Sequence, residues 1–111
     1  MEASKNSSPS PIEILEDVSP LAAKTYLDHR AQIMDNPDLQ ALTKKQKLLV
    51  GIGVASALQS STCTTMWVKH AVKAGASNEE IAEALMVARL MKAATVNDTA
   101  ADALQWLKTS R

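Results

Sequence analysis

Cys63, the one cysteine in the 111-residue chain, lies within the stretch SSTCTTMW at residues 60–67. Ser60, Ser61 and Thr62 are residue types that favour the N-cap of a helix, so the sequence predicts a helix that starts beside Cys63. In the first turn of a helix, free backbone N–H groups and the positive end of the helix dipole stabilise a thiolate. The pattern therefore permits nucleophilic or redox chemistry at Cys63.

A nucleophilic thiol usually works with a nearby base, and the candidate here is His70. Seven residues separate His70 from Cys63, which corresponds to two helical turns, or about 10 Å along the axis. Direct contact is not expected, and His70 is also explained as a surface or interface residue. Free cysteine is among the residue types most often buried, so Cys63 as a small packing residue is a second interpretation.

The composition excludes several classes of protein. The 12 basic and 12 acidic residues give zero formal net charge, so neither nucleic acid nor a membrane is an expected partner. A single cysteine excludes an intramolecular disulfide. His29 and His70 are too far apart to suggest a metal site, and no glycine-rich phosphate loop is present, so we expect no metal and no cofactor.

Targeting and membrane segments are not expected either. The first residues lack the apolar region of a signal peptide. The longest nearly continuous apolar run, at residues 48–58, is shorter than the roughly 20 residues that cross a bilayer. We expect a soluble, cytoplasmic protein.

The spacing of apolar residues and caps predicts an all-α fold of about six helices. Residues 1–10 are rich in Ser, Asn, Pro and charge and are expected to be a disordered tail, and residues 11–111 to form one domain. The first two expected helices begin at Pro11 and Pro20. The third covers residues 44–59, and the fourth extends from the caps at residues 60–62 to Gly75. The fifth covers residues 78–94, and the last lies near residues 96–107.

Two of these segments carry an unusually large apolar surface. Residues 48–58 are apolar or small almost throughout, which predicts a helix that is buried on all sides, with small residues that allow close approach of neighbours. Val50, Ile52 and Val54 also permit a strand, but the length and a Thr43–Gln46 capping pair favour a helix. The segment 78–94 has two apolar faces. Because one small domain cannot cover so much surface, we expect a homo-oligomer.

The segment LTKKQKLLVGIGVASAL, the cysteine-bearing turn and HAVKAGASNEEIAEALMVARLM together resemble the carboxymuconolactone decarboxylase family, including its alkylhydroperoxidase D branch. The resemblance covers residues 42–91, about half of the chain, and is most specific in the run KAGASNEEIAEA. It implies the helical fold of alkylhydroperoxidase D and assembly as a homotrimer or homohexamer.

The redox branch of this family carries a Glu, a Cys-x-x-Cys pair and a His, in which the cysteines reduce peroxide and the Glu and His relay protons. The family His precedes the helix-ending Gly by eight residues. Counting back from Gly75 places Trp67 at the His, Cys63 at the second Cys, Ser60 at the first Cys and Leu48 at the Glu. The start of the segment, aligned separately, also places Leu48 at the Glu.

A rival register takes Cys63 as the first cysteine, Met66 as the second and His70 as the His. In the favoured register only Cys63 remains of the motif, since Leu48 carries no proton and the Trp67 indole only donates hydrogen bonds.

Three functions stay open. The first is a single-cysteine peroxidase in which Cys63 is catalytic and an external thiol is the reductant. The second is a non-redox protein with a decarboxylase-like or ligand-binding pocket for a small molecule, for which the candidates are Leu48, Ser60, Trp67 and His70. The third is a catalytically silent oligomeric module.

Overall fold

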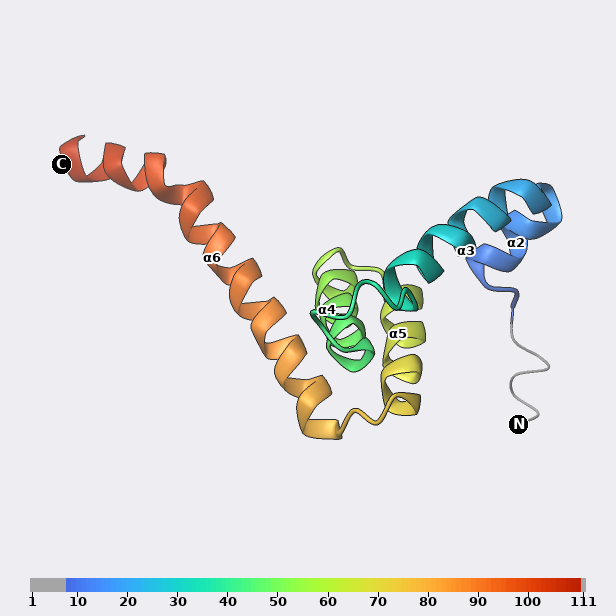
Figure 1. Ribbon diagram of the computed structural model, residues 1–111. Helices are drawn as coiled ribbons and strands as arrows, with labels where there is room; N and C mark the ends of the chain where they lie inside the picture. The colour runs from blue at the N-terminus through green and yellow to red at the C-terminus, as the bar shows by residue number, and fades with distance from the viewer. Residues whose placement is uncertain (1–7, 111) are drawn as a thin grey trace. The chain divides into compact units, whose positions relative to one another are not determined.

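The computed structural model describes residues 8–110, and this part of the chain is entirely helical (Figure 1). It contains α2 (Pro11–Val18), α3 (Pro20–Met34), α4 (Lys44–Ala57), α5 (Ser61–Lys73) and α6 (Asn78–Ser110). The all-α prediction is confirmed, and the strand alternative at residues 50–54 is wrong because they lie inside α4. Residues 1–7 of the expected disordered tail lie outside the described residues.

Two compact units divide the chain between Lys44 and Lys45. The expectation of one domain over residues 11–111 stays a prediction. In the first unit, α2 and α3 pack against each other, and Ala23 is buried. Serine caps start both helices: the Ser10 hydroxyl accepts the Glu13 N–H at 3.3 Å, and the Ser19 hydroxyl accepts the Ala22 N–H at 3.1 Å.

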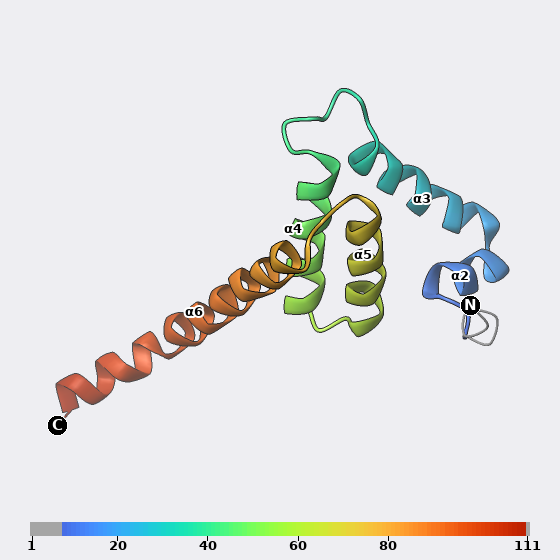
Figure 2. The same cartoon turned by 90° about the horizontal axis from the view of Figure 1, so that it is seen from below.

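In the second unit, α4 and α5 run side by side and α6 begins next to them (Figures 1 and 2). The buried residues of this unit are Leu48, Ile52 and Ala55 of α4 and Ala71 of α5. The α4 residues follow each other at spacings of four and three, so they form one helix face. The opposite side of α4 is exposed at Val50 and Val54, and the expectation that α4 is buried on all sides is therefore wrong for that side.

The neighbours of α4 approach it at its two glycines. A Cβ atom added to Gly51 would lie 3.9 Å from the Trp67 ring of α5. One added to Gly53 would lie 3.6 Å from the Ala84 carbonyl oxygen and 3.7 Å from the Ala88 Cβ of α6. These are ordinary van der Waals distances, so the packing at both glycines leaves space for a methyl group.

Helix α6 continues without a break through the expected boundary between residues 94 and 96. The sequence from 78 to 110 contains neither Gly nor Pro, which are the residues that end helices most effectively. The Thr95 hydroxyl donates to the Lys92 carbonyl oxygen at 2.6 Å, so it is used inside the helix rather than as a cap. A separate helix near residues 96–107 is thus wrong, and five helices replace the expected six within residues 8–110.

The start of α6 is fixed by a capping box formed by Ser77 and Glu80. The Glu80 N–H donates to the Ser77 hydroxyl at 3.0 Å, and the Ser77 N–H donates to Glu80 Oε1 at 2.8 Å. Lys45 Nζ lies 2.9 Å from Glu80 Oε2 and so connects the start of α4 to the start of α6. The Ser77 N–H, and then Lys45, hold the pKa of Glu80 below its ordinary value.

We expect Gly51→Ala and Gly53→Ala each to raise the free energy of unfolding by about 0.5–1 kcal/mol, because glycine is unfavourable inside a helix and the methyl group has space. Gly75→Ala should lower it by about 1–2 kcal/mol, because Gly75 has φ of 92°. Urea unfolding followed by circular dichroism measures all three. A destabilised Gly53→Ala variant would show that α4 and α6 are closer than described.

The lowered pKa of Glu80 predicts a loss of stability in acid. A carboxyl group with a depressed pKa stabilises the fold above its unfolded-state pKa, and this contribution disappears as the pH falls through the folded-state pKa. The affected range therefore lies around and below 4.5, the ordinary value. Urea unfolding across this range should show a shallower pH dependence for Glu80→Gln than for the parent, whereas Glu79→Gln serves as the control. Parallel curves for Glu80→Gln and the parent would contradict the prediction.

Candidate functional site

A tight turn between α4 and α5 positions the cysteine. Gln59 has φ of 64°, and the Ser60 N–H donates to the Ala55 carbonyl oxygen at 3.0 Å. Ser60 is the N-cap of α5: its hydroxyl accepts the Cys63 N–H at 3.2 Å, and its carbonyl oxygen accepts the Thr64 N–H at 2.9 Å. Cys63 is therefore the third residue of α5, in the first turn that the sequence predicts.

Cys63 is half-buried, so part of the residue is in contact with solvent. The backbone N–H groups of Ser61 and Thr62 open α5 and have no carbonyl partner within the helix, because the first N–H groups of a helix have none. Helical side chains lean toward the N-terminus, which brings the Cys63 sulfur toward this positive end. The partial exposure of Cys63 at this position leaves the residue accessible to a reagent.

Trp67 and His70 lie further along α5. Trp67 follows Cys63 by one turn, is half-buried, and faces Gly51 of α4. Its ring centroid lies 5.6 Å from that of His70, with the ring planes tilted by 49°. His70 is exposed and sits in the last turn of α5, two turns beyond Cys63. The structure therefore groups Trp67 with His70 and leaves His70 too far along the helix to contact the thiol directly.

Leu48 occupies the centre of the core, with 1% of its surface exposed. It precedes Gly51 by one turn of α4, and Gly51 faces Trp67. The four positions that the favoured register assigns to the redox motif thus belong to the α4–α5 side of the unit. Only the cysteine among them carries a group that ionises, so the chain supplies a thiol there without an acid or base from the motif positions.

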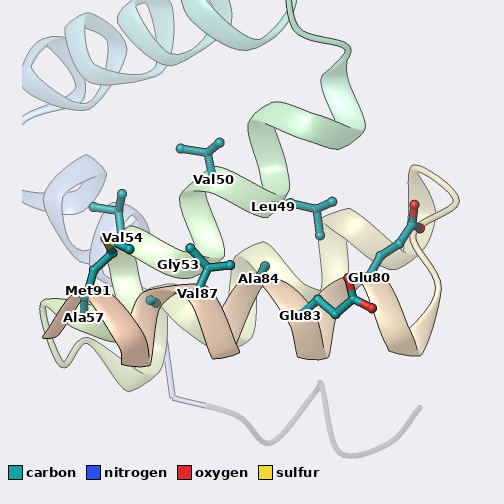
Figure 3. A pocket seen from close by; sticks show the side chains of 11 residues that line it. Leu49, Val50, Gly53, Val54, Ala57, Glu80, Glu83, Ala84, Val87 and Met91 are labelled. Carbon is teal, nitrogen blue, oxygen red and sulfur yellow. The ribbon is translucent and has the colours of Figure 1, made fainter. Parts of the chain in front are cut away.

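An open groove between α4 and α6, of about 510 Å³, is the feature that the sequence reasoning missed (Figure 3). We call it the α4–α6 groove. Its apolar walls include Val50, Gly53 and Val54 of α4 and Ala84, Val87 and Met91 of α6, and Glu80 and Glu83 lie at one end. A second hollow, of about 630 Å³, is lined by Gln59 and by residues of α4 and α6, of which Ala57 and Ala88 also line the groove. The signal for the groove was the apolar character of α6 on more than one face.

Neither hollow is lined by Cys63, Trp67 or His70. In the part of the chain that the structure describes, no three His, Cys, Asp or Glu side chains are grouped as metal ligands. Among the helices of residues 8–110, none combines the length and the apolar character that crossing a membrane requires.

The helical fold and the sequence around the thiol point to one family. The profile of the carboxymuconolactone decarboxylase family matches residues 20–108. The chain therefore belongs to the carboxymuconolactone decarboxylase family, which confirms the resemblance and extends it beyond residues 42–91.

A solved structure supports the same fold. The crystal structure of a protein from Methanobacterium thermoautotrophicum, a structural genomics target, is 27% identical to this chain and superimposes with a TM-score of 0.73. The match covers 81% of this chain and 95% of the other. No curated protein matches the chain.

The register of the redox motif can be tested by adding a second cysteine. We expect Ser60→Cys to form a disulfide with Cys63, because residues 60 and 63 would reproduce the Cys-x-x-Cys spacing at the start of α5. Loss of the serine cap should cost about 0.5–2 kcal/mol of stability. Thiol counting after mild oxidation measures closure, and a peroxidase assay with a dithiol measures turnover. Higher turnover in Met66→Cys than in Ser60→Cys would support the rival register.

Proposed function

We propose that the chain is a single-cysteine peroxidase that acts through Cys63. The observation that carries the proposal is the placement of Cys63 as a half-buried residue in the first turn of α5, with the Ser60 hydroxyl occupied as the cap. Membership in the carboxymuconolactone decarboxylase family supports it further, because the redox branch of this family uses cysteine in the same region.

The proposed reaction has two stages. The Cys63 thiolate attacks the terminal oxygen of a hydroperoxide. An S–O bond forms as the O–O bond breaks, and the leaving alkoxide takes a proton to become an alcohol. The resulting sulfenic acid then reacts with an external thiol, which gives a mixed disulfide and water. A second external thiol releases the reduced Cys63 and leaves as a disulfide with the first. A reducing compartment such as the cytoplasm would supply these thiols.

The substitutions around Cys63 determine how this reaction differs from that of a dithiol enzyme. Ser60 cannot resolve the sulfenic acid, so the second stage depends on a thiol from outside the chain. Leu48 and Trp67 provide no general base, and such a base is typically worth about 10²–10⁴-fold in rate. The chain should therefore react more slowly with peroxide than a family member with the complete motif.

The proposal predicts that Cys63 in the folded protein forms a sulfenic acid with peroxide. Brief peroxide treatment in the presence of dimedone should add one label per chain, located at Cys63 by mass spectrometry, and turnover should require an added monothiol or dithiol. Cys63→Ser should abolish labelling and turnover, whereas Thr65→Ser, an exposed change in the same helix, should leave both intact. If Cys63 reacts only after unfolding, it is a packing residue and the proposal fails.

A second candidate function, a non-redox binding site beside Trp67, rests on the half-buried indole and its contact with the exposed His70 ring. An aromatic wall of this kind suits a small organic ligand. In this case Trp67→Ala would abolish ligand binding while Cys63→Ser would preserve it, which separates this function from the peroxidase.

A further inference from the structure

The second hollow between α4 and α6 carries positive charge. Its volume is about 630 Å³, and all of its lining belongs to the second unit. Arg89 and Lys92 line it, and none of the described residues of its lining is acidic. The α4–α6 groove has the opposite character, because its charged residues are Glu80 and Glu83. We call the second hollow the cationic hollow.

Arg89 and Lys92 have no compensating carboxylate. The positions three and four residues before and after each of them hold neither Asp nor Glu, so no ion pair along α6 neutralises them. Among residues 8–110, neither side chain forms a salt bridge. The two cations are three residues apart, which makes them neighbours on the helix surface, and like charges at such a spacing repel each other. An anion bound between them removes this repulsion.

The apolar and the charged residues of the hollow occupy different sections of α6. One row of the helix surface carries, at spacings of three, four and three residues, Ala82, Leu85, Arg89 and Lys92. Met86 lies beside Leu85 and also lines the hollow. The apolar section from Ala82 to Met86 is about 6 Å long, and the two cations follow it at one end. This surface is complementary to a molecule with an apolar chain and an anionic head.

Gln59 also lines the hollow, and it occupies a position that usually carries glycine. Helix α4 ends in a Schellman motif: the Ser60 N–H donates to the Ala55 carbonyl oxygen at 3.0 Å, and the Gln59 N–H donates to the Ser56 carbonyl oxygen at 3.0 Å. The motif requires a left-handed residue, and Gln59 has φ of 64°. This conformation is unfavourable for a residue with a side chain. Strain of this kind is concentrated at sites that bind ligands.

We propose that the cationic hollow binds a single-chain organic anion. The Arg89 guanidinium and the Lys92 ammonium donate hydrogen bonds to the anionic head, and the Gln59 amide adds a neutral donor. The chain of the ligand lies against Leu85 and Met86. A carboxylate and a phosphate both satisfy these donors. Because the thiol does not line the hollow, this binding does not depend on redox chemistry.

Calorimetric titration of the full-length protein tests the charge requirement. The probes are octanoate and octyl phosphate below their micelle-forming concentrations, and octyltrimethylammonium has the same chain with the opposite charge. We expect saturable binding of one anion per chain, about tenfold or more tighter than that of the cation. The anion with the higher affinity identifies the head group. Equal affinities for anions and cation, or binding that does not saturate, overturn the proposal.

Substitution of the two cations tests their role. Arg89→Gln and Lys92→Gln should each weaken binding of the preferred anion about tenfold, because each removes a charged hydrogen-bond donor. Lys69→Gln removes the same charge from an exposed position of α5 outside the hollow and should leave the affinity unchanged. If both hollow variants bind as tightly as the parent, the cations do not form an anion site.

Two adjacent residues of α6 separate the cationic hollow from the α4–α6 groove. Met86 and Val87 are both exposed, but Met86 lines the cationic hollow and Val87 lines the groove. Met86→Ser should weaken binding of the preferred anion about fivefold through loss of apolar contact, whereas Val87→Ser should not change it. The reverse result places the chain of the ligand in the groove and overturns the proposal.

Gln59→Gly gives a test in which stability and binding change in opposite directions. Glycine adopts the left-handed conformation without strain, so the variant should unfold at a higher urea concentration than the parent. It should also bind the preferred anion more weakly, because the amide donor is lost. A Gln59→Gly variant with the affinity of the parent overturns the assignment of Gln59 to the site.

Discussion

Helix α4 is apolar or small on almost every side, and the second unit provides two helices to cover it. Leu48, Ile52 and Ala55 form the face that is fully buried, and Gly51 meets Trp67 of α5. Gly53 meets Ala84 and Ala88 of α6. Two neighbours cannot surround a helix, since side chains project from it in all directions. The exposed Val50 and Val54 and the α4–α6 groove follow from this geometry.

Local features of the fold could be predicted from the sequence because each depends on a few adjacent residues. The caps at Ser10, Ser19 and Ser60 and the Ser77–Glu80 box all act within four positions. The placement of Cys63 in a first turn followed from the same logic, so the position of the candidate thiol was predictable. The family could be recognised because the run after Gly75 is specific in sequence.

Features that depend on packing could not be predicted in the same way. Separate helices were expected on the two sides of residue 95, but a helix without Gly or Pro has little reason to end there, and Thr95 bonds back into it. Prediction of the α4–α6 groove requires knowledge of which helices pack against α4. Exposure of Cys63 and His70 also depends on those neighbours, so periodicity alone left their roles open.

The thiol and the groove lie on different faces of α4. The buried face of α4 consists of Leu48, Ile52 and Ala55, and Gly51 lies next to Trp67 of α5, whereas Leu49, Val50, Gly53, Val54 and Ala57 line the groove. The packing beside the start of α5 and the lining of the α4–α6 groove therefore come from separate sets of side chains on one central helix. They are coupled through the buried face of α4, because a substitution that moves this helix changes both the α5 contact at Gly51 and the α6 contact at Gly53. Substitutions beside the thiol can thus leave the lining of the groove unchanged, since no residue of α4 belongs to both sets.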